Sequence, residues 1–318
     1  VKDADIIHLH WINQGFLSLK DIEELVKLNK PIVWTMHDMW PCTGICHHAR
    51  DCEKFQMGCE SCFFLKSKGK DLSTSVFDKK LSLYKEANIT FVGCSRWLSG
   101  RAKKSYLLRD KTVLSIPNPI DTEVYHPMDQ DMTRELLGLP SGKRLLLFGA
   151  LNVTDKRKGI DYLIEALRKI EKQDVELVVF GQVKDDIRGL FPVSIHSMGY
   201  LSDESKIVAL YNAVDMFITS SLEENLPNTI MESMACGTPC VGFEIGGIPE
   251  MIDHKINGYV ASYKDASDLA NGIRWVLEHE DQQALSDACV KKVQENYTEE
   301  VVAKQYMALY KRLLHQKK

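Results

Sequence analysis

Two glutamates eight positions apart are the residues of this sequence best suited to chemistry. Glu224 lies in a polar loop after a predicted strand, and Glu232 lies about one turn inside the next predicted helix, which opens near Pro227. The amides of Asn228 and Thr229 would then lie at a helix N-terminus beyond the carboxyl end of a strand, where open α/β sheets bind anions and nucleotides. A carboxylate at Glu232 can accept two hydrogen bonds from a vicinal diol such as ribose. Taken alone, either glutamate also fits a solvated loop acid or a complement to the helix dipole.

A short run of charge, Asp155-Lys-Arg-Lys-Gly159, follows a different predicted strand and precedes another helix. Its three cations would project at the carboxyl edge of the same sheet, where fixed positive charge suits a diphosphate. A solvated run of charge is the alternative. Gly246 and Gly247 stand at a further strand-to-helix turn, where two glycines allow the backbone to approach a ligand closely or simply form the turn.

In the N-terminal half, His37 follows a predicted strand and is expected at its carboxyl end, facing a cleft between two domains. It could donate to a β-phosphate or a sugar hydroxyl, with Asp38 orienting the ring. A histidine satisfied by local hydrogen bonds is the alternative. His8 and His10 alternate along the first predicted strand and are interpreted mainly as structural residues.

Nine cysteines occur in the chain, and five of them fall close together, at Cys42, Cys46, Cys52, Cys59 and Cys62. The C-x2-C spacing of Cys59 and Cys62 is the turn that zinc sites use, and Cys46 and Cys52 could complete a four-thiolate structural site, with His47 or His48 as alternates. Two disulfides, or reduced cysteines packed as small apolar groups, are the other interpretations. A closed all-sulfur site has no open position, so no catalytic metal is expected.

The elements that must position these residues alternate between strands and amphipathic helices. Several strands are apolar throughout, which is typical of parallel strands covered on both faces. The alternation predicts an α/β protein with parallel sheets. The predicted strands are Asp5–Leu9, Ile32–Met36, Thr90–Cys94, Thr112–Ile116, Arg144–Gly149, Val175–Gly181, Ser194–Met198, Met216–Thr219, Pro239–Phe243 and Gly258–Ala261.

Length and composition favour two globular domains in 318 residues. Three prolines within residues 117–127 mark a linker, so we expect an N-terminal domain over 1–117, a linker over 118–127, a C-terminal domain over 128–298 and a closing helix over 299–318. The net charge of −4 argues against a general nucleic-acid binder. No apolar run approaches the roughly 18 residues that span a membrane.

The motifs together resemble the retaining glycosyltransferases of family four, which have the GT-B fold of two Rossmann-like domains. Glu224-x7-Glu232 resembles that family's E-x7-E signature, and Gly246-Gly247 with Glu250 is similar to its GG-x-P-E element. Arg157-Lys158-Gly159 resembles its phosphate-binding K-G element, and residues 116–121 resemble the segment at its domain junction.

The resemblance implies a nucleotide-diphosphate sugar as donor and a saccharide or lipid-linked saccharide as acceptor. It implies that Lys158 contacts the diphosphate, Glu232 the ribose and Glu224 the sugar hydroxyls, and that the family's comparable histidine is His37. The remaining positions implied for the donor site are Arg157, Asn225, Leu226, Asn228, Thr229, Gly199 and Leu201. Two departures stand out: Gly149-Ala150 lacks the arginine that the family often has there, a role that Arg157 would take over, and Asn225 replaces a common glycine.

The function that the resemblance implies is hexosyl transfer with retention of configuration, in bacterial surface polysaccharide assembly, by a cytoplasmic and membrane-peripheral enzyme. The alternatives are a nucleotide-sugar-binding module without turnover and a GT-B-type epimerase. An NAD-linked dehydrogenase is disfavoured because no G-x-G-x-x-G follows a strand. The chain opens on Val1 inside a strand-like segment with few strands before the linker, so we expect the N-terminal domain to be incomplete.

Overall fold

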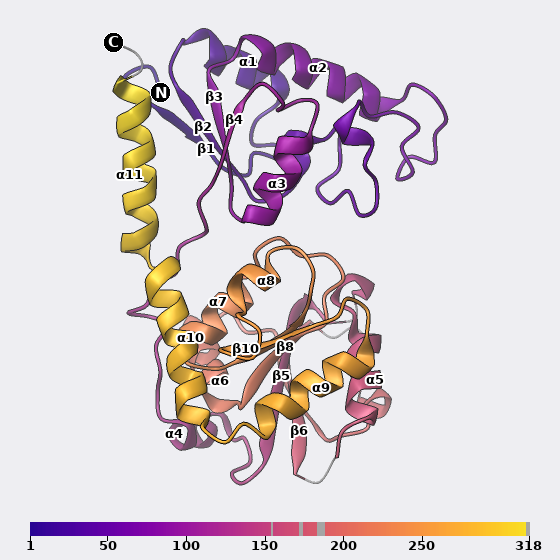
Figure 1. Cartoon of the computed structure of the whole chain (residues 1–318), viewed down its shortest axis with the longest axis vertical. Helices are drawn as coiled ribbons and strands as arrows, with labels where there is room; N and C mark the ends of the chain where they lie inside the picture. The colour runs from indigo at the N-terminus through magenta and orange to yellow at the C-terminus, as the bar shows by residue number, and fades with distance from the viewer. Residues whose placement is uncertain (154, 172–173, 183–187, 316–318) are drawn as a thin grey trace. The chain divides into compact units, whose positions relative to one another are not determined.

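The computed structural model describes residues 1–153, 155–171, 174–182 and 188–315, and the chain forms two compact units (Figure 1). The first unit comprises Val1–Pro117 together with the residues from Ala303 on, and the second comprises Asn118–Val302. The C-terminal helix α11 (Glu299–His315) therefore contributes its first residues to the second unit and the rest to the first.

The first unit is built on a four-stranded parallel sheet in the order β1-β2-β3-β4. Strands β2 and β3 are buried at every position, as expected of central parallel strands. Asp71 caps the N-terminus of α2, and Ser95 caps that of α3. The elements are β1 (Ile7–Leu9), α1 (Leu19–Lys27), β2 (Ile32–Met36), α2 (Leu72–Glu86), β3 (Ile89–Gly93), α3 (Arg96–Lys104) and β4 (Thr112–Ser115).

The second unit contains a six-stranded parallel sheet in the order β10-β9-β8-β5-β6-β7. The chain runs outward from β5 through β6 to β7, then returns to add β8, β9 and β10 on the other side of β5. This is the doubly wound order, in which the direction of winding reverses between β5 and β8. The strands are β5 (Arg144–Asn152), β6 (Val175–Gln182), β7 (Ile195–Gly199), β8 (Met216–Thr219), β9 (Cys240–Phe243) and β10 (Gly258–Ala261).

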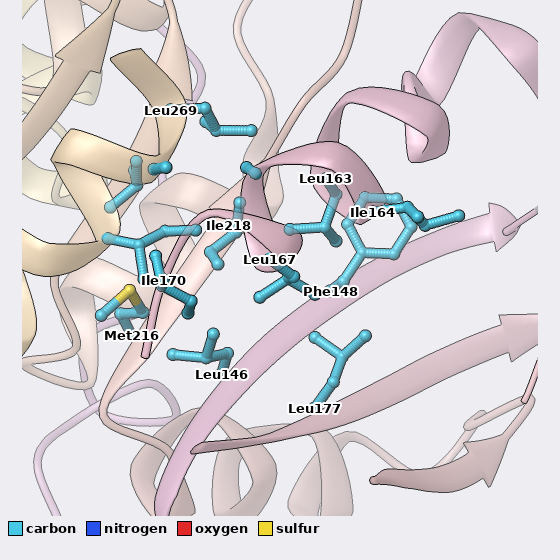
Figure 2. Close-up of a cluster of buried hydrophobic side chains, with 14 of the residues drawn as sticks. Leu146, Phe148, Leu163, Ile164, Leu167, Ile170, Leu177, Met216, Ile218 and Leu269 are labelled. Atoms are coloured by element: carbon cyan, nitrogen blue, oxygen red, sulfur yellow. The ribbon is translucent and has the colours of Figure 1, made fainter. Parts of the chain in front are cut away.

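Helices cover this second sheet and bury its aliphatic strands. Leu146 and Phe148 of β5 pack in one cluster with Leu163 and Leu167 of α5 (Figure 2). Leu145 and Leu147, on the opposite face of β5, are also fully buried, so this strand is covered on both sides. The helices are α4 (Gln130–Leu137), α5 (Ile160–Arg168), α6 (Glu204–Ala213), α7 (Asn228–Ala235), α8 (Ile248–Met251), α9 (Ala266–Leu277) and α10 (Gln282–Asn296).

The structure confirms the predicted fold class, an α/β protein with two parallel sheets, and contains a strand at each of the ten predicted places. Their ends differ by a few residues: β5, for example, continues to Asn152. The proline-rich stretch after Pro117 packs onto the second unit, because buried Ile120 donates its amide to Tyr297 O at 2.8 Å.

The long segment between β2 and α2 contains two short 3₁₀ turns, η1 (Trp40–Cys42) and η2 (Lys54–Gln56), and is otherwise irregular. The ammonium of Lys80 on α2 is fully buried beneath it and donates to the carbonyl oxygens of Trp40, Thr43 and Gly44 at 2.6–3.1 Å. One cation thus satisfies three backbone acceptors of a loop that has little secondary structure. Of the helices in the described ranges, none is both long and apolar enough to cross a membrane.

Candidate functional site

Two loops meet at the carboxyl ends of β5 and β8, where the sheet order reverses. The loop after β5 forms a 3₁₀ turn, η3 (Lys156–Lys158), and the loop after β8 runs through Ser220–Pro227. Ser220 Oγ donates to Lys158 O at 2.9 Å, and the Leu222 amide donates to Arg157 O at 2.7 Å. These bonds join the loop after β5, which carries the cations, to the loop after β8, which carries Glu224. Open α/β sheets bind ligands at this kind of crevice.

A glycine makes the contact between the two loops possible. Gly159 has a φ of 64°, in the left-handed region, and a Cβ there would lie 2.0 Å from Ser220 O. Only glycine fits that approach without moving the backbone.

The loop after β9 also packs against the loop after β8, which carries Glu224. The Gly247 amide donates to Asn225 O at 2.6 Å. Gly246 has a φ of 59°, and a Cβ there would lie 1.9 Å from Glu224 O. The glycine pair therefore serves close backbone packing that fixes the position of Glu224.

Lys158 and Glu224 form an ion pair between the two loops, with Lys158 Nζ 2.5 Å from Glu224 Oε1. The Glu224 side chain is 15% exposed and that of Lys158 34%, so the pair is partly shielded from water. An ammonium has three donors. Lys158 can therefore hold Glu224 and still donate to an anion at the same edge of the sheet.

Glu232 lies one turn inside α7 and accepts a hydrogen bond from the Tyr211 hydroxyl at 2.8 Å. Burial raises the pKa of Glu232, the hydrogen bond from Tyr211 acts in the opposite direction, and Glu204 raises it further. The Tyr211 side chain is fully buried, so its hydroxyl holds the carboxylate in place. The second carboxylate oxygen retains acceptor capacity for a diol.

The N-terminus of α7 is not closed by a side chain. Pro227 occupies the N-cap position and makes no capping hydrogen bond. The first amides of a helix have no intrahelical acceptor, so those of Asn228 and Thr229 form an anion-binding end. Asn225 and Leu226, just before Pro227 in the chain, are buried.

Arg157 is engaged locally, in a way that the sequence did not predict. Its Nη2 lies 2.6 Å from Asp155 Oδ2, and its Nε donates to both carboxylate oxygens at 3.1–3.2 Å. Asp155 also caps the turn through the Arg157 amide. Arg157 can replace the arginine that is absent after Gly149, and bind a donor phosphate, only when its ion pair with Asp155 breaks.

Gly199 and Leu201 lie at the carboxyl end of β7, the edge strand of the sheet. Strand β6 separates β7 from β5, so these two residues are at the same edge of the sheet as Lys158 but not beside it. The structure thus brings Lys158 and Glu224 into direct contact and places Gly199 and Leu201 farther along.

In the first unit, His37 lies just beyond β2 and pairs with His10, which lies just beyond the neighbouring strand β1. His10 Nδ1 is 3.1 Å from His37 Nε2 and the rings are stacked. Burial is the main cause that lowers the pKa of both rings. From the sequence alone His10 is interpreted as a structural residue. Two histidines that each follow one of two adjacent parallel strands are nevertheless expected to lie side by side.

Asp38, which the sequence predicts to orient the His37 ring, forms hydrogen bonds with several other groups. It accepts the Trp11 indole N–H at 2.9 Å and the Trp40 amide at 2.7 Å, and its Oδ2 lies 2.7 Å from His47 Nδ1. His8 bonds Thr35 Oγ1 at 2.8 Å and Tyr310 OH at 2.6 Å, and burial is the largest cause that lowers its pKa to about 4. These contacts agree with the structural interpretation of His8.

All nine cysteines have free thiols. Burial, followed by the neighbouring thiols of Cys62, Cys59 and Cys52, raises the pKa of Cys46 to about 12, and the Gly44 amide donates to Cys59 Sγ at 3.3 Å. Among the residues with described positions, no three or more His, Cys, Asp or Glu side chains are arranged to hold a metal ion. Zinc at Cys46, Cys52, Cys59 and Cys62 stays a prediction, which the metal content of the purified chain would test.

Comparison with known proteins shows which class of protein this sheet and its loops resemble. Residues 142–279 match the model of the family described as "Glycosyl transferases group 1". This range contains β5 to α9 and, apart from His37, the donor-site residues proposed above. The second unit is therefore similar to the group 1 glycosyltransferases over these residues.

Two curated relatives and one solved structure show how far the similarity extends. The chain is 25% identical over 207 residues to the N-acetyl-alpha-D-glucosaminyl L-malate synthase of Bacillus anthracis, covering 63% of this chain and 54% of that protein. It is 23% identical over 276 residues to the putative colanic acid biosynthesis glycosyl transferase WcaC of Escherichia coli, covering 83% and 65%. The structure of Anabaena Alr3699/HepE in complex with UDP aligns with a TM-score of 0.74 at 16% identity, over 98% of this chain and 79% of that one.

The match spans between half and two thirds of the length of these two curated relatives. The structural likeness extends over both units and agrees with the predicted GT-B fold.

Proposed function

We propose that this chain transfers a glycosyl group from a nucleotide-diphosphate sugar to an acceptor hydroxyl with retention of configuration. The Lys158–Glu224 ion pair at the switch point of the second sheet carries this proposal. It combines a cation suited to a diphosphate with a carboxylate suited to sugar hydroxyls, and both lie near the uncapped end of α7.

The chemistry at this site is mainly stabilisation of the leaving group. As the bond to the anomeric carbon breaks, negative charge develops on the departing diphosphate, and Lys158 and the α7 amides neutralise it. Glu224 holds the sugar through its hydroxyls, and Glu232 holds the ribose diol. His37, whose lowered pKa keeps the ring neutral near pH 7, supplies a further donor to the leaving phosphate or the sugar.

Two relatives support the class of donor and product. HepE was solved with UDP, and WcaC is named for colanic acid biosynthesis. We infer a nucleotide-sugar donor for this chain and a role in bacterial surface polysaccharide assembly, with a saccharide or a lipid-linked saccharide as acceptor.

Calorimetric titration with UDP, GDP and ADP tests the donor site. We expect one of them to bind, and Lys158→Met to weaken it about 10- to 100-fold, because a charge-assisted hydrogen bond contributes roughly 1.5–3 kcal/mol. Lys156→Met is the matched control, since Lys156 is exposed on the same turn. Absence of binding to all three diphosphates, or equal losses in the two variants, would contradict the proposal.

Turnover is tested separately with the corresponding nucleotide sugar in the absence of acceptor. A transferase slowly releases free diphosphate to water, and Glu224→Ala should abolish that release while leaving diphosphate affinity within about threefold, because Glu224 is proposed to contact the sugar. A chain that binds the nucleotide sugar but releases nothing would be a binding module. Conversion of the bound sugar to its epimer would identify an epimerase instead.

A further inference from the structure

The segment Ser61–Asp71 in the first unit closes on itself as a compact loop just before α2 (Figure 1). The Ser61 amide donates to Gly69 O at 2.8 Å, and the Gly69 amide donates to Ser61 Oγ at 2.8 Å. Asp71 accepts the Cys62 amide at 2.8 Å and also the Ser67 hydroxyl. The base of the loop is therefore held by hydrogen bonds at both ends.

The outermost residues of this loop are apolar. Phe63, Phe64 and Leu65, called the apolar tip below, are 50%, 44% and 40% exposed. The two phenyl rings lie 4.0 Å apart between centroids, and the Arg50 guanidinium lies 5.3 Å from the centre of the Phe64 ring. Single exposed apolar side chains are common, but three consecutive ones in an ordered turn indicate a contact surface.

Positive charge follows the apolar tip directly. The sequence from Phe63 to Lys70 contains three lysines at alternate positions and no acidic residue. Lys66, Lys68 and Lys70 are all exposed. Aromatic and aliphatic side chains next to exposed lysines are the composition of segments that lie in the interface of an anionic bilayer.

We propose that the loop Ser61–Asp71 docks the protein onto a membrane that contains anionic lipids. The apolar tip enters the boundary between headgroups and acyl chains, and the three lysines bind the negatively charged headgroups around it. Arg50, whose guanidinium lies 5.7 Å from the centre of the Phe63 ring and 5.3 Å from that of Phe64, adds a fourth cation beside the apolar tip. The contact is interfacial and needs no membrane-spanning helix.

The size of the surface favours a bilayer over a protein partner. A phenylalanine side chain buries about 150–250 Å² when fully covered, so three half-exposed side chains offer on the order of 300 Å². A stable protein interface needs roughly 800 Å² on each partner. A bilayer needs no complementary shape, and its charge attracts each lysine independently of the others.

Co-sedimentation with lipid vesicles tests the proposal on the whole chain. We expect the chain to sediment with vesicles of phosphatidylcholine and phosphatidylglycerol, weakly with phosphatidylcholine alone, and less as salt is raised. The variant F63S/F64S/L65S should bind at least tenfold more weakly. The variant K66Q/K68Q/K70Q should lose about fivefold per lysine, since each contributes about 1 kcal/mol near an anionic surface.

Two matched controls distinguish docking through this loop from non-specific adsorption of the chain to vesicles. M132S/L136S removes two apolar side chains of α4 that are 68% and 71% exposed, and K79Q/K103Q/K104Q removes three exposed lysines of the first unit. Both controls should bind vesicles like the unchanged chain. Because all the substituted side chains are exposed, thermal unfolding midpoints should be similar throughout.

Three outcomes would overturn the proposal. The first is that the unchanged chain does not sediment with anionic vesicles. The second is that the tip variant binds as well as M132S/L136S. The third is that sedimentation velocity shows a dimer that the tip variant abolishes, which would assign the apolar tip to a second copy of the chain. None of these measurements depends on glycosyl transfer, so they stand apart from the tests of the proposed activity.

Discussion

The protonation of Glu232, a proposed donor-site carboxylate, depends on its surroundings. Burial raises its pKa above the ordinary 4.5, and Glu204 adds to the shift. A raised pKa means that the folded chain keeps a proton that the unfolded chain has released. Its contribution to stability is therefore full below about pH 4.5 and is lost as pH rises through the raised value. The capacity to accept two hydrogen bonds from ribose appears only above that value.

We expect nucleotide affinity to increase as pH rises through the Glu232 pKa, and Glu232→Gln to remove that increase. Titrations of both proteins with the same diphosphate at each pH give the difference, in which protonation of the phosphate cancels. Glu204→Gln should move the increase to lower pH, because Glu204 raises the Glu232 pKa. An identical pH profile in the chain with Glu232 and in Glu232→Gln would exclude this role.

At the scale of elements, the loops after β5, β8 and β9 pack backbone against backbone, and this packing requires glycine at the points of contact. Gly159 touches the loop after β8, and Gly246 touches the same loop from the side of β9. This packing places Lys158 and Glu224 within ion-pair distance although they are 66 residues apart. The three loops therefore form one packed unit around Lys158 and Glu224.

Gly159→Ala should weaken nucleotide binding at least tenfold and destabilise the second unit by more than Gly138→Ala. Both glycines have a φ of 64°, but a Cβ at Gly138 meets nothing within 4 Å, whereas at Gly159 it meets Ser220 O. The left-handed conformation alone costs alanine about 1–2 kcal/mol, so Gly138→Ala measures that part. Denaturant unfolding and titration compare the two variants, and equal effects would show that the close contact is unimportant.

At the scale of the whole molecule, most of helix α11 belongs to the first unit, although it follows the second unit in the sequence. The residues of α11 from Ala303 on belong to the first unit. Tyr306 OH lies 2.8 Å from Thr35 Oγ1, and Leu309 and Leu313 are buried. The second unit is therefore a continuous stretch of chain inserted between two parts of the first.

Leu309→Ala and Leu313→Ala should each destabilise the first unit by about 2–5 kcal/mol. Met307→Ala, on the same helix and 52% exposed, should change stability by less than about 0.5 kcal/mol. Tryptophan fluorescence in denaturant follows the first unit, because Trp275 is the sole tryptophan of the second. Nucleotide affinity of the second unit should be unchanged; a parallel loss there would contradict this division of the chain.

Much of the fold could be predicted because its signals are local. Runs such as that of β6 are apolar enough to identify buried parallel strands, and several of the strands were found from such runs. Pro227 precedes the helix that carries Glu232, so the position of that glutamate could also be predicted. The basic turn before Gly159 was found because charge and glycine follow a strand directly.

The tertiary structure decided which of these residues meet. The order of the strands puts β8 beside β5, and this brings Glu224 to Lys158. The same kind of pairing puts β1 beside β2 and joins His10 to His37, while Arg157 turns back onto Asp155. Local sequence determines where strands and turns form, because backbone propensity and burial act over a few residues. Which strands become neighbours depends on packing over the whole sheet, and that packing assembles the site.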